Sequence, residues 1–188
     1  MKKNLLLIAI LIFCVKSGLS QEDESNLYKR DTQKNDISIN LHPFLITEGF
    51  SINYDRVLKK DISIGINFFK AYDNQNTIDN RDIDITSRTN FSIMPNIKYY
   101  VGKRFARRFY VQGLAMISSG TQTSFVNNNQ TAQDIDFTDI ALGIGIGDKR
   151  ILKNGVFIDF GIAIAYNIID KNSPDILVHP NLSLGYRF

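Results

Sequence analysis

Residues 175–188, DILVHPNLSLGYRF, decide the fold of this chain of 188 residues. Their side chains alternate between a bulky apolar face and a polar face, and an alternation of period two over this length is typical of a β-strand. The stretch stops on an aromatic residue, so we expect its apolar face to contact a non-aqueous neighbour. The apolar face carries Val178, Pro180, Leu182, Leu184, Tyr186 and Phe188, and the other face carries His179, Asn181, Ser183, Gly185 and Arg187.

Seven segments upstream alternate in the same way, and together with the last one they predict an all-β fold of eight antiparallel strands. The even number favours an up-and-down meander that closes into a transmembrane barrel. The facing of the fifth segment stays open, because the bulky Leu114 and Met116 fall on the same face as Tyr110 and Gln112. The seven segments are residues 36–44, 49–57, 61–72, 88–101, 109–120, 134–147 and 155–168.

The connections between these segments are of two kinds, short and basic or longer and rich in Asn, Gln and Asp. Short turns at one rim and long loops at the other are typical of outer-membrane barrels, in which the long loops lie outside the cell and both termini are periplasmic. Residues 81–88 and 134–139 keep a strand-like alternation that includes Asp, so we expect these strands to continue above the bilayer. The short connections are residues 58–60, 102–108 and 148–154, and the long ones are 73–87 and 126–133.

Aromatic residues and prolines add detail to this barrel. Pro95 and Pro180 each remove one ladder hydrogen bond and predict bulges or positions near a strand end. Aromatic side chains near both ends of the segments are typical of two interfacial girdles. Those toward the basic turns are Tyr54, Tyr99, Phe109, Tyr186 and Phe188, and those toward the loops are Phe44, Phe50, Phe68, Phe91 and Tyr166.

Three stretches together resemble the small eight-stranded outer-membrane β-barrel family of the OmpX and OmpA-transmembrane-domain type: the terminal GYRF, the hairpin GFSINYDRVLKKDISIGINF at residues 49–68, and RFYVQG at residues 108–113. The resemblance implies a monomeric barrel in the outer membrane of a Gram-negative bacterium, in contact with its lipid. Tyr186 and Phe188 match the aromatic pair of the C-terminal assembly signal, which implies recognition by the outer-membrane barrel assembly machinery. Ser183 departs from the signal, which often has glycine there.

Residues 1–20 are predicted to be a cleaved signal peptide, with Lys2 and Lys3 ahead of an apolar core at residues 5–15. The core is too short to span about 30 Å of hydrocarbon. Cys14, the only cysteine, would leave with the signal, and so would three lysines, which leaves 19 basic against 19 acidic residues. Net charge therefore gives no reason to expect a nucleic-acid partner. Residues 21–35 predict a flexible periplasmic segment, and residues 36–188 the barrel domain.

Four charged residues, Asp55, Lys98, Asp159 and Arg187, fall on inward faces near the periplasmic ends of their strands. An eight-stranded barrel is filled by its own side chains, and buried charges are normally paired. We therefore expect a mutually neutralising interior network rather than a catalytic acid and base.

His42 and His179 lie on the first and last segments, which become neighbours when the barrel closes. Both are expected to face inward toward the extracellular half. Two readings stay open: a weak transition-metal or pH-sensitive pair, or two interior polar groups satisfied by hydrogen bonds. No cofactor site is predicted, because GIGIG at residues 143–147 lacks the lysine of a phosphate-binding loop and is explained as small residues that make room inside the barrel.

The sequence favours a structural or surface-interaction protein that acts through its loops, and no catalytic constellation is recognised. Two alternatives remain: a lipid-modifying enzyme with an active site at the rim, and a secreted lipocalin-like carrier. A carrier would have an apolar cavity and a polar exterior. In residues 134–147 and 155–168 the bulky residues oppose small ones, which favours a membrane barrel over a carrier.

Overall fold

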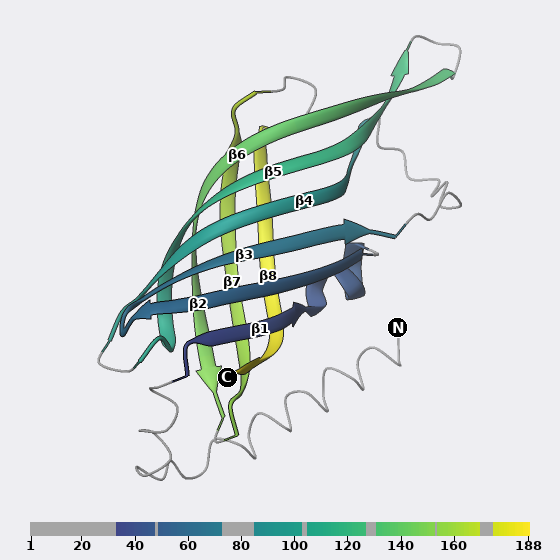
Figure 1. Ribbon diagram of the computed structural model, residues 1–188. Helices are drawn as coiled ribbons and strands as arrows, with labels where there is room; N and C mark the ends of the chain where they lie inside the picture. The colour runs from purple at the N-terminus through teal and green to yellow at the C-terminus, as the bar shows by residue number, and fades with distance from the viewer. Residues whose placement is uncertain are drawn as a thin grey trace.

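The computed structural model describes residues 33–47, 49–72, 85–102, 105–126, 131–152, 154–169 and 175–188. Within these ranges eight strands pair in sequence order, each antiparallel to the next, and the last pairs with the first to close a barrel (Figure 1). The predicted closed, antiparallel, eight-stranded barrel is therefore confirmed. The strands are β1 (Asn35–Asn40), β2 (Gly49–Lys59), β3 (Ile62–Ala71), β4 (Ile85–Tyr100), β5 (Arg108–Val126), β6 (Thr131–Ile151), β7 (Val156–Asn167) and β8 (Ile176–Arg187).

The N-terminal predictions fall largely outside this description. The predicted signal peptide and residues 21–32 of the predicted periplasmic segment are not among the described residues. Within the described ranges, no helix is both long and apolar enough to cross a bilayer. The segment that the structure does describe begins just before β1, whose first residue, Asn35, exchanges two backbone hydrogen bonds with Phe188.

The alternation in each strand separates an outward apolar face from an inward face. In β6, for example, Leu142, Ile144 and Ile146 are exposed on the outside, whereas Ala141 is buried inside. The glycines between them make room as predicted, because a Cβ on Gly145 would lie 2.7 Å from the Cβ of Ala163. Wherever two neighbouring strands pair, the ladder gives the backbone groups of the wall their partners within the sheet.

The two rims differ. The connections β2–β3, β4–β5 and β6–β7 lie at the same rim as Phe188, which we call the turn rim; the opposite one is the loop rim (Figure 1). At the loop rim β4, β5 and β6 run beyond their neighbours. Pairing of β3 with β4 stops at Lys70 and Phe91, and pairing of β6 with β7 stops at Ala141 and Asn167.

This projection confirms that the strands continue past the barrel proper, although residues 81–84 lie outside the described ranges. The predicted bounds 109–120 and 134–147 were too short. The predicted turn at residues 148–154 was wrong at its start, since β6 continues to Ile151. Arg150 and Ile151 still have partners on β7, so the ladder holds these basic residues in strand conformation.

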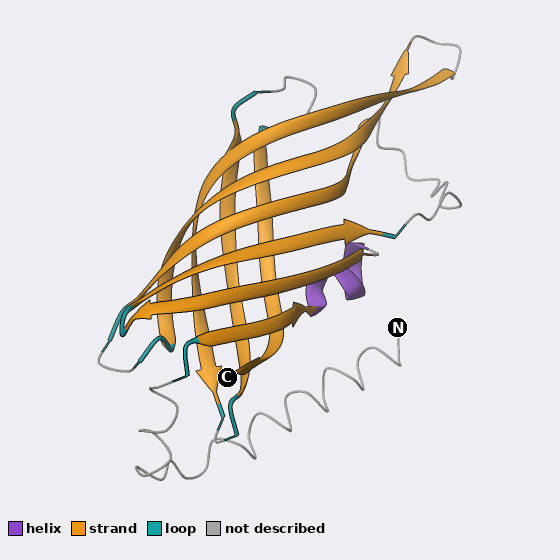
Figure 2. Cartoon of the chain, in the orientation of Figure 1, coloured by secondary structure: helices purple, strands orange, loops and turns teal. Residues whose placement is uncertain are grey.

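The first strand is shorter than the predicted 36–44 and ends at Asn40. The side-chain Oδ1 of Asn40 accepts a hydrogen bond from the backbone N–H of His42 at 3.1 Å, which turns the chain out of the ladder. Pro43 follows without an N–H to donate and begins a short helical segment, η1 (Pro43–Thr47), drawn in purple in Figure 2. Beyond Asn40 this segment therefore no longer pairs with β8, although β8 itself continues to Ile176.

The prolines do not produce bulges. The β4–β5 register is the same on both sides of Pro95, and the β7–β8 register is unchanged through Pro180. The register shifts instead between Val57 and Lys59 and between Thr89 and Phe91. Pro180 lies inside β8, opposite Ile162 of β7 and past the last residue that pairs with β1, and Pro95 lies inside β4 opposite Ile66, so the strand-end alternative was also wrong.

The open question about the fifth strand is settled by burial. Tyr110, Leu114 and Met116 are buried inside the barrel, whereas Val111 and Ile117 are exposed outside. The inward face of β5 is thus polar at Tyr110 near the turn rim, apolar at Leu114 and Met116, and polar again at the buried Ser118.

Candidate functional site

Among the described residues, six buried side chains form a charge network in the turn-rim half of the interior. Three carboxylates face three cations, so the formal charge of the network is zero. Each of the six has less than a tenth of its surface exposed. The members are Asp36, Asp55, Asp159, Lys98, Lys149 and Arg187.

Two lysines bridge the carboxylates at the centre of the network. Lys98 Nζ lies 2.8 Å from Asp55 Oδ2 and 3.4 Å from Asp159 Oδ2. Lys149 Nζ lies 2.9 Å from Asp55 Oδ2, 3.0 Å from Asp36 Oδ2 and 3.7 Å from Asp159 Oδ2. Because each carboxylate shares its cations with another, the network behaves as a unit rather than as separate ion pairs.

Arg187 ties the network to the end of the barrel. Its guanidinium makes a bidentate contact with Asp36, through Nε to Oδ1 at 2.6 Å and Nη2 to Oδ2 at 2.8 Å. The same Nη2 donates to the backbone carbonyl of Ala106 at 2.9 Å, and Nη1 donates to that of Phe105 at 3.4 Å. Residues of the β4–β5 connection are thereby held against the turn-rim end of the network.

Aromatic rings complete the packing around these charges. The hydroxyl of Tyr110 donates to Asp159 Oδ1 at 2.8 Å, and its ring lies 5.5 Å from that of Tyr100. Lys149 Nζ lies 4.7 Å from the ring centroid of Phe157. Apart from a cavity of about 20 Å³ beside Lys98, Tyr110 and Asp159, the protein itself fills this half of the interior in the described part of the chain.

The structure brings together the four charged residues predicted from the sequence and adds Asp36 and Lys149. A signal for both existed in the alternation. Asp36 shares the face of Ser38 and Asn40, and Lys149 continues the inward series that begins with the glycines of β6. Lys149 was overlooked because it was assigned to a basic turn instead of a strand.

Above the charge network, a layer of amide and hydroxyl side chains crosses the barrel. Asn53 Nδ2 donates to Ser183 Oγ at 3.1 Å, and Ser183 Oγ donates to Asn181 Oδ1 at 2.6 Å. Asn67 Nδ2 donates to Ser51 Oγ at 2.7 Å. This layer separates the charges from an apolar region nearer the loop rim.

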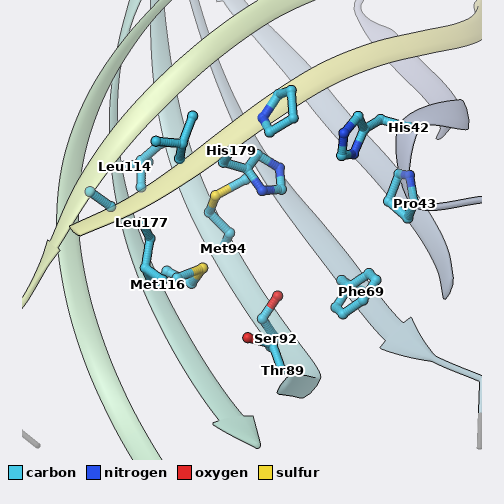
Figure 3. Close-up of a pocket in the computed structure, with 13 residues that line it drawn as sticks. His42, Pro43, Phe69, Thr89, Ser92, Met94, Leu114, Met116, Leu177 and His179 are labelled. Carbon is cyan, nitrogen blue, oxygen red and sulfur yellow. The ribbon is translucent and has the colours of Figure 1, made fainter. Parts of the chain in front are cut away.

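The apolar region borders a cavity of about 310 Å³, which we call the upper chamber (Figure 3). Its apolar lining comes from β3, β4, β5, β7, β8 and the segment after β1, and two histidines and the hydroxyls of Thr89 and Ser92 add polar groups. Figure 3 shows that His42 reaches the upper chamber from the segment after β1 and His179 from β8. The chamber is defined here by His42, Met94, Leu114, Met116, Ala165 and His179.

The two histidines thus share one chamber. Among the described residues no group of three or more His, Cys, Asp or Glu side chains comes close enough to hold a metal ion. None of the described residues that line the chamber is a carboxylate. Two imidazoles alone make a poor metal site, so the arrangement suits hydrogen bonding at the chamber wall.

The outer surface carries exposed apolar side chains on every strand. All ten aromatic residues assigned to girdles are exposed there, including Tyr186 and Phe188 of the expected assembly signal. This is the reverse of the polar exterior expected for a lipocalin-like carrier. Among the described residues the most exposed large apolar side chain is that of Ile144 on β6, at 76%.

No protein-family model and no curated protein matches the chain. Solved structures of small outer-membrane β-barrels are similar to it. The N-terminal β-barrel domain of Pseudomonas aeruginosa OprF is 11% identical, with a TM-score of 0.49 over 83% of this chain and 98% of that chain. Ail, the attachment invasion locus protein of Yersinia pestis, is 16% identical, with a TM-score of 0.45 over 83% of this chain and 99% of that chain. Neisserial surface protein A is 17% identical, with a TM-score of 0.43 over 82% of this chain and 93% of that chain.

Proposed function

We propose that the protein is an integral outer-membrane β-barrel of a Gram-negative bacterium and acts at the cell surface through the strands that project from its loop rim. The observation that supports membrane placement is the inside-out arrangement of its side chains. Charged residues such as Lys149 and Arg187 are buried inside, whereas isoleucines such as Ile144 are exposed outside. An apolar surface that circles the molecule would drive aggregation in water and is stable in a bilayer.

The orientation follows from the two rims. Short turns lie in the periplasm and projecting elements lie outside in barrels of this type. The C-terminal strand then ends in the periplasm, with Tyr186 and Phe188 exposed on its lipid-facing side. That position makes them accessible to an assembly machinery that recognises the last strand.

The projecting sheet supports a surface-interaction role. In the part of the chain that the structure describes, residues 85–89 of β4 pair with β5 and lie beyond the last β3 partner. Residues 131–138 of β6 likewise pair with β5 and lie beyond the last β7 partner. A strand with one unpaired edge can accept a strand from another protein. The proposed partner is therefore an extracellular protein that adds a strand at one of these edges.

Membrane placement is tested by fractionation of cells that express the chain. We expect the mature protein in the outer-membrane fraction, extracted only with detergent and migrating differently on gels before and after boiling. Recovery of folded protein in the soluble fraction without detergent would contradict the proposal.

The surface role is tested by shortening the projecting hairpin. Replacement of residues 121–136 by an Asn-Gly turn leaves Gly120 opposite Phe137, a register suited to a two-residue hairpin. A photo-crosslinking residue at the exposed Thr138 should capture a discrete protein partner on cells in the full-length chain and lose it in the shortened one. The same residue at Ile144, lower on the strand, is the control.

A second excision removes residues 74–84 of the other predicted interaction loop and leaves the hairpin intact. The barrel fold of both variants is checked by the gel shift on boiling. If cell adhesion and the Thr138 adduct are unchanged by both excisions, the interaction role is to be abandoned.

A further inference from the structure

We infer that the upper chamber binds an acyl chain of a membrane lipid, which enters sideways through the barrel wall between β1 and β8. The inference rests on the proposed placement in a membrane. It adds a binding site inside the barrel, separate from the projecting strands.

The wall between β1 and β8 is incomplete. Their pairing runs from Asp36 and Arg187 to Asn40 and Ser183, and within the described residues it goes no further. β8 nevertheless continues to Ile176, paired only with β7 on its other side. We call the gap beside residues 176–182 of β8 the side opening.

The backbone at the lower edge of the side opening is already satisfied. The carboxamide of Asn40 accepts from the N–H of Leu182 at 3.2 Å and donates to the carbonyl of Pro180 at 3.5 Å. Since the carbonyl of Pro180 points toward β1, its nitrogen faces the same side and, in proline, has no hydrogen to leave unpaired. At residues 180 and 182 this edge of β8 therefore exposes no unpaired N–H group to hydrocarbon.

The upper chamber borders this gap. Four consecutive residues of β8, Leu177 to Pro180, line the chamber, and among the described residues none of the four has a ladder partner on β1. The chamber therefore lies directly behind the unpaired edge of β8. Val178 is 59% exposed on the outside, so the opening lies within the apolar surface proposed to contact lipid.

The size and lining of the chamber fit an acyl chain. Its volume of about 310 Å³ equals that of about ten water molecules in the liquid. Met94, Leu114 and Met116 offer water little to bond, and thioether side chains adapt to flexible apolar ligands. In the proposed membrane placement, the side opening faces the lipid around the barrel. His42 and His179 line the same chamber and can donate hydrogen bonds to ester or phosphate oxygens of that lipid.

The test uses the mature chain refolded into vesicles that contain phosphatidylcholine with a diazirine at the end of one acyl chain. After illumination, mass spectrometry locates the labelled residues. We expect label on the inward-facing Leu114 and Met116 as well as on the outward-facing Ile117. Ala165→Phe should fill the chamber and reduce the inward label about tenfold, the equivalent of about 1.4 kcal/mol of binding free energy.

Ala115→Phe adds the same bulk on the outer face of β5 and should leave the inward label unchanged. If Ala165→Phe fails to fold, Met116→Phe fills the chamber from β5, and label is then read at Leu114. Outward label without inward label would overturn the inference and leave membrane placement intact. Inward label that persists in the filled variant would also overturn it. Absence of label at every position would overturn membrane placement and the inference together.

Discussion

Lys149 is the residue on which the interior of the barrel depends most directly. It is fully buried and lies within 3.0 Å of carboxylate oxygens from both Asp36 and Asp55. Without it, three carboxylates would face only Lys98 and Arg187. An unmatched buried charge is costly, because the interior cannot solvate it as water does.

We therefore expect Lys149→Met to lower the free energy of unfolding by about 3 to 5 kcal/mol, the usual cost of breaking a buried ion pair from one side. Urea unfolding of the refolded barrel in detergent measures this change. Methionine keeps much of the lysine stem, so the effect reports on the charge.

The matched control is Arg150→Ala on the same strand. Arg150 pairs with Asp148 at 2.9 Å, but its side chain is 39% exposed. Partly exposed pairs contribute about 0 to 1 kcal/mol. Equal losses in the two variants would show that burial of the network does not control its contribution.

At the residue scale, the alternation pointed to four of the six charged residues, and the other two were overlooked, Lys149 because the alternation was stopped early. Asp55, Lys98, Asp159 and Arg187 were found from their inward positions, and the structure places them in one network. The sequence could not reveal that Asn40 would replace part of a strand, because that role depends on Pro180 and Leu182, 140 and 142 residues away.

At the scale of one element, β8 carries both the contacts that close the barrel and the proposed assembly signal. Phe188 is half-exposed on the outer face, while its backbone N–H and carbonyl both bond to Asn35 of β1. The side chain is therefore available for recognition without being needed for the backbone contacts that close the barrel.

We expect Phe188→Ala to reduce the amount of folded barrel in the outer membrane and to leave periplasmic material open to proteolysis. Loss of the side chain should cost at most a few kcal/mol when the purified variant is refolded in detergent. Phe109→Ala, with a similarly exposed ring at the same rim, controls for loss of an aromatic residue. Normal amounts of heat-modifiable barrel in cells that carry Phe188→Ala would count against the assembly role.

The lengths of elements were harder to predict than their existence. All eight strands follow from period-two alternation, but β1 ended early and β5 and β6 ran on. Alternation records which face is buried and says little about where a neighbouring strand stops. Pairing with a strand that is distant in sequence sets where each strand ends. Residues 148–151, for example, were predicted as a turn but pair with β7 as part of β6.

At the scale of the whole molecule, the layers of the interior predict an absence of conductance. The charge network, Tyr100, Tyr110 and Phe157 fill the turn-rim half, and the upper chamber does not extend through it. In planar bilayers we expect no stepwise current from the wild-type barrel at moderate voltage. Reproducible single-channel steps would contradict a filled interior.

The global fold was predictable because a closed sheet is the arrangement that satisfies the backbone of alternating strands in a membrane. The upper chamber and the side opening could not be predicted from the sequence. They arise from the early end of β1 and from Leu114, Met116 and Met94 meeting inside the barrel, and neither can be read from a single strand.

Arg187 and Asp36 join the two ends of the barrel, 151 residues apart in sequence. A contact of this separation forms only after most of the chain is in place, since closing long loops is entropically slow. We therefore expect the network to form late in folding. Its loss should leave the folding rate nearly unchanged and raise the unfolding rate. In stopped-flow or manual-mixing kinetics, Asp36→Asn should raise the unfolding rate and leave the folding rate unchanged. The lifetime of the closed barrel then depends on the charge network at the turn rim. Slower folding of that variant would instead show that the charge network is among the first contacts to form.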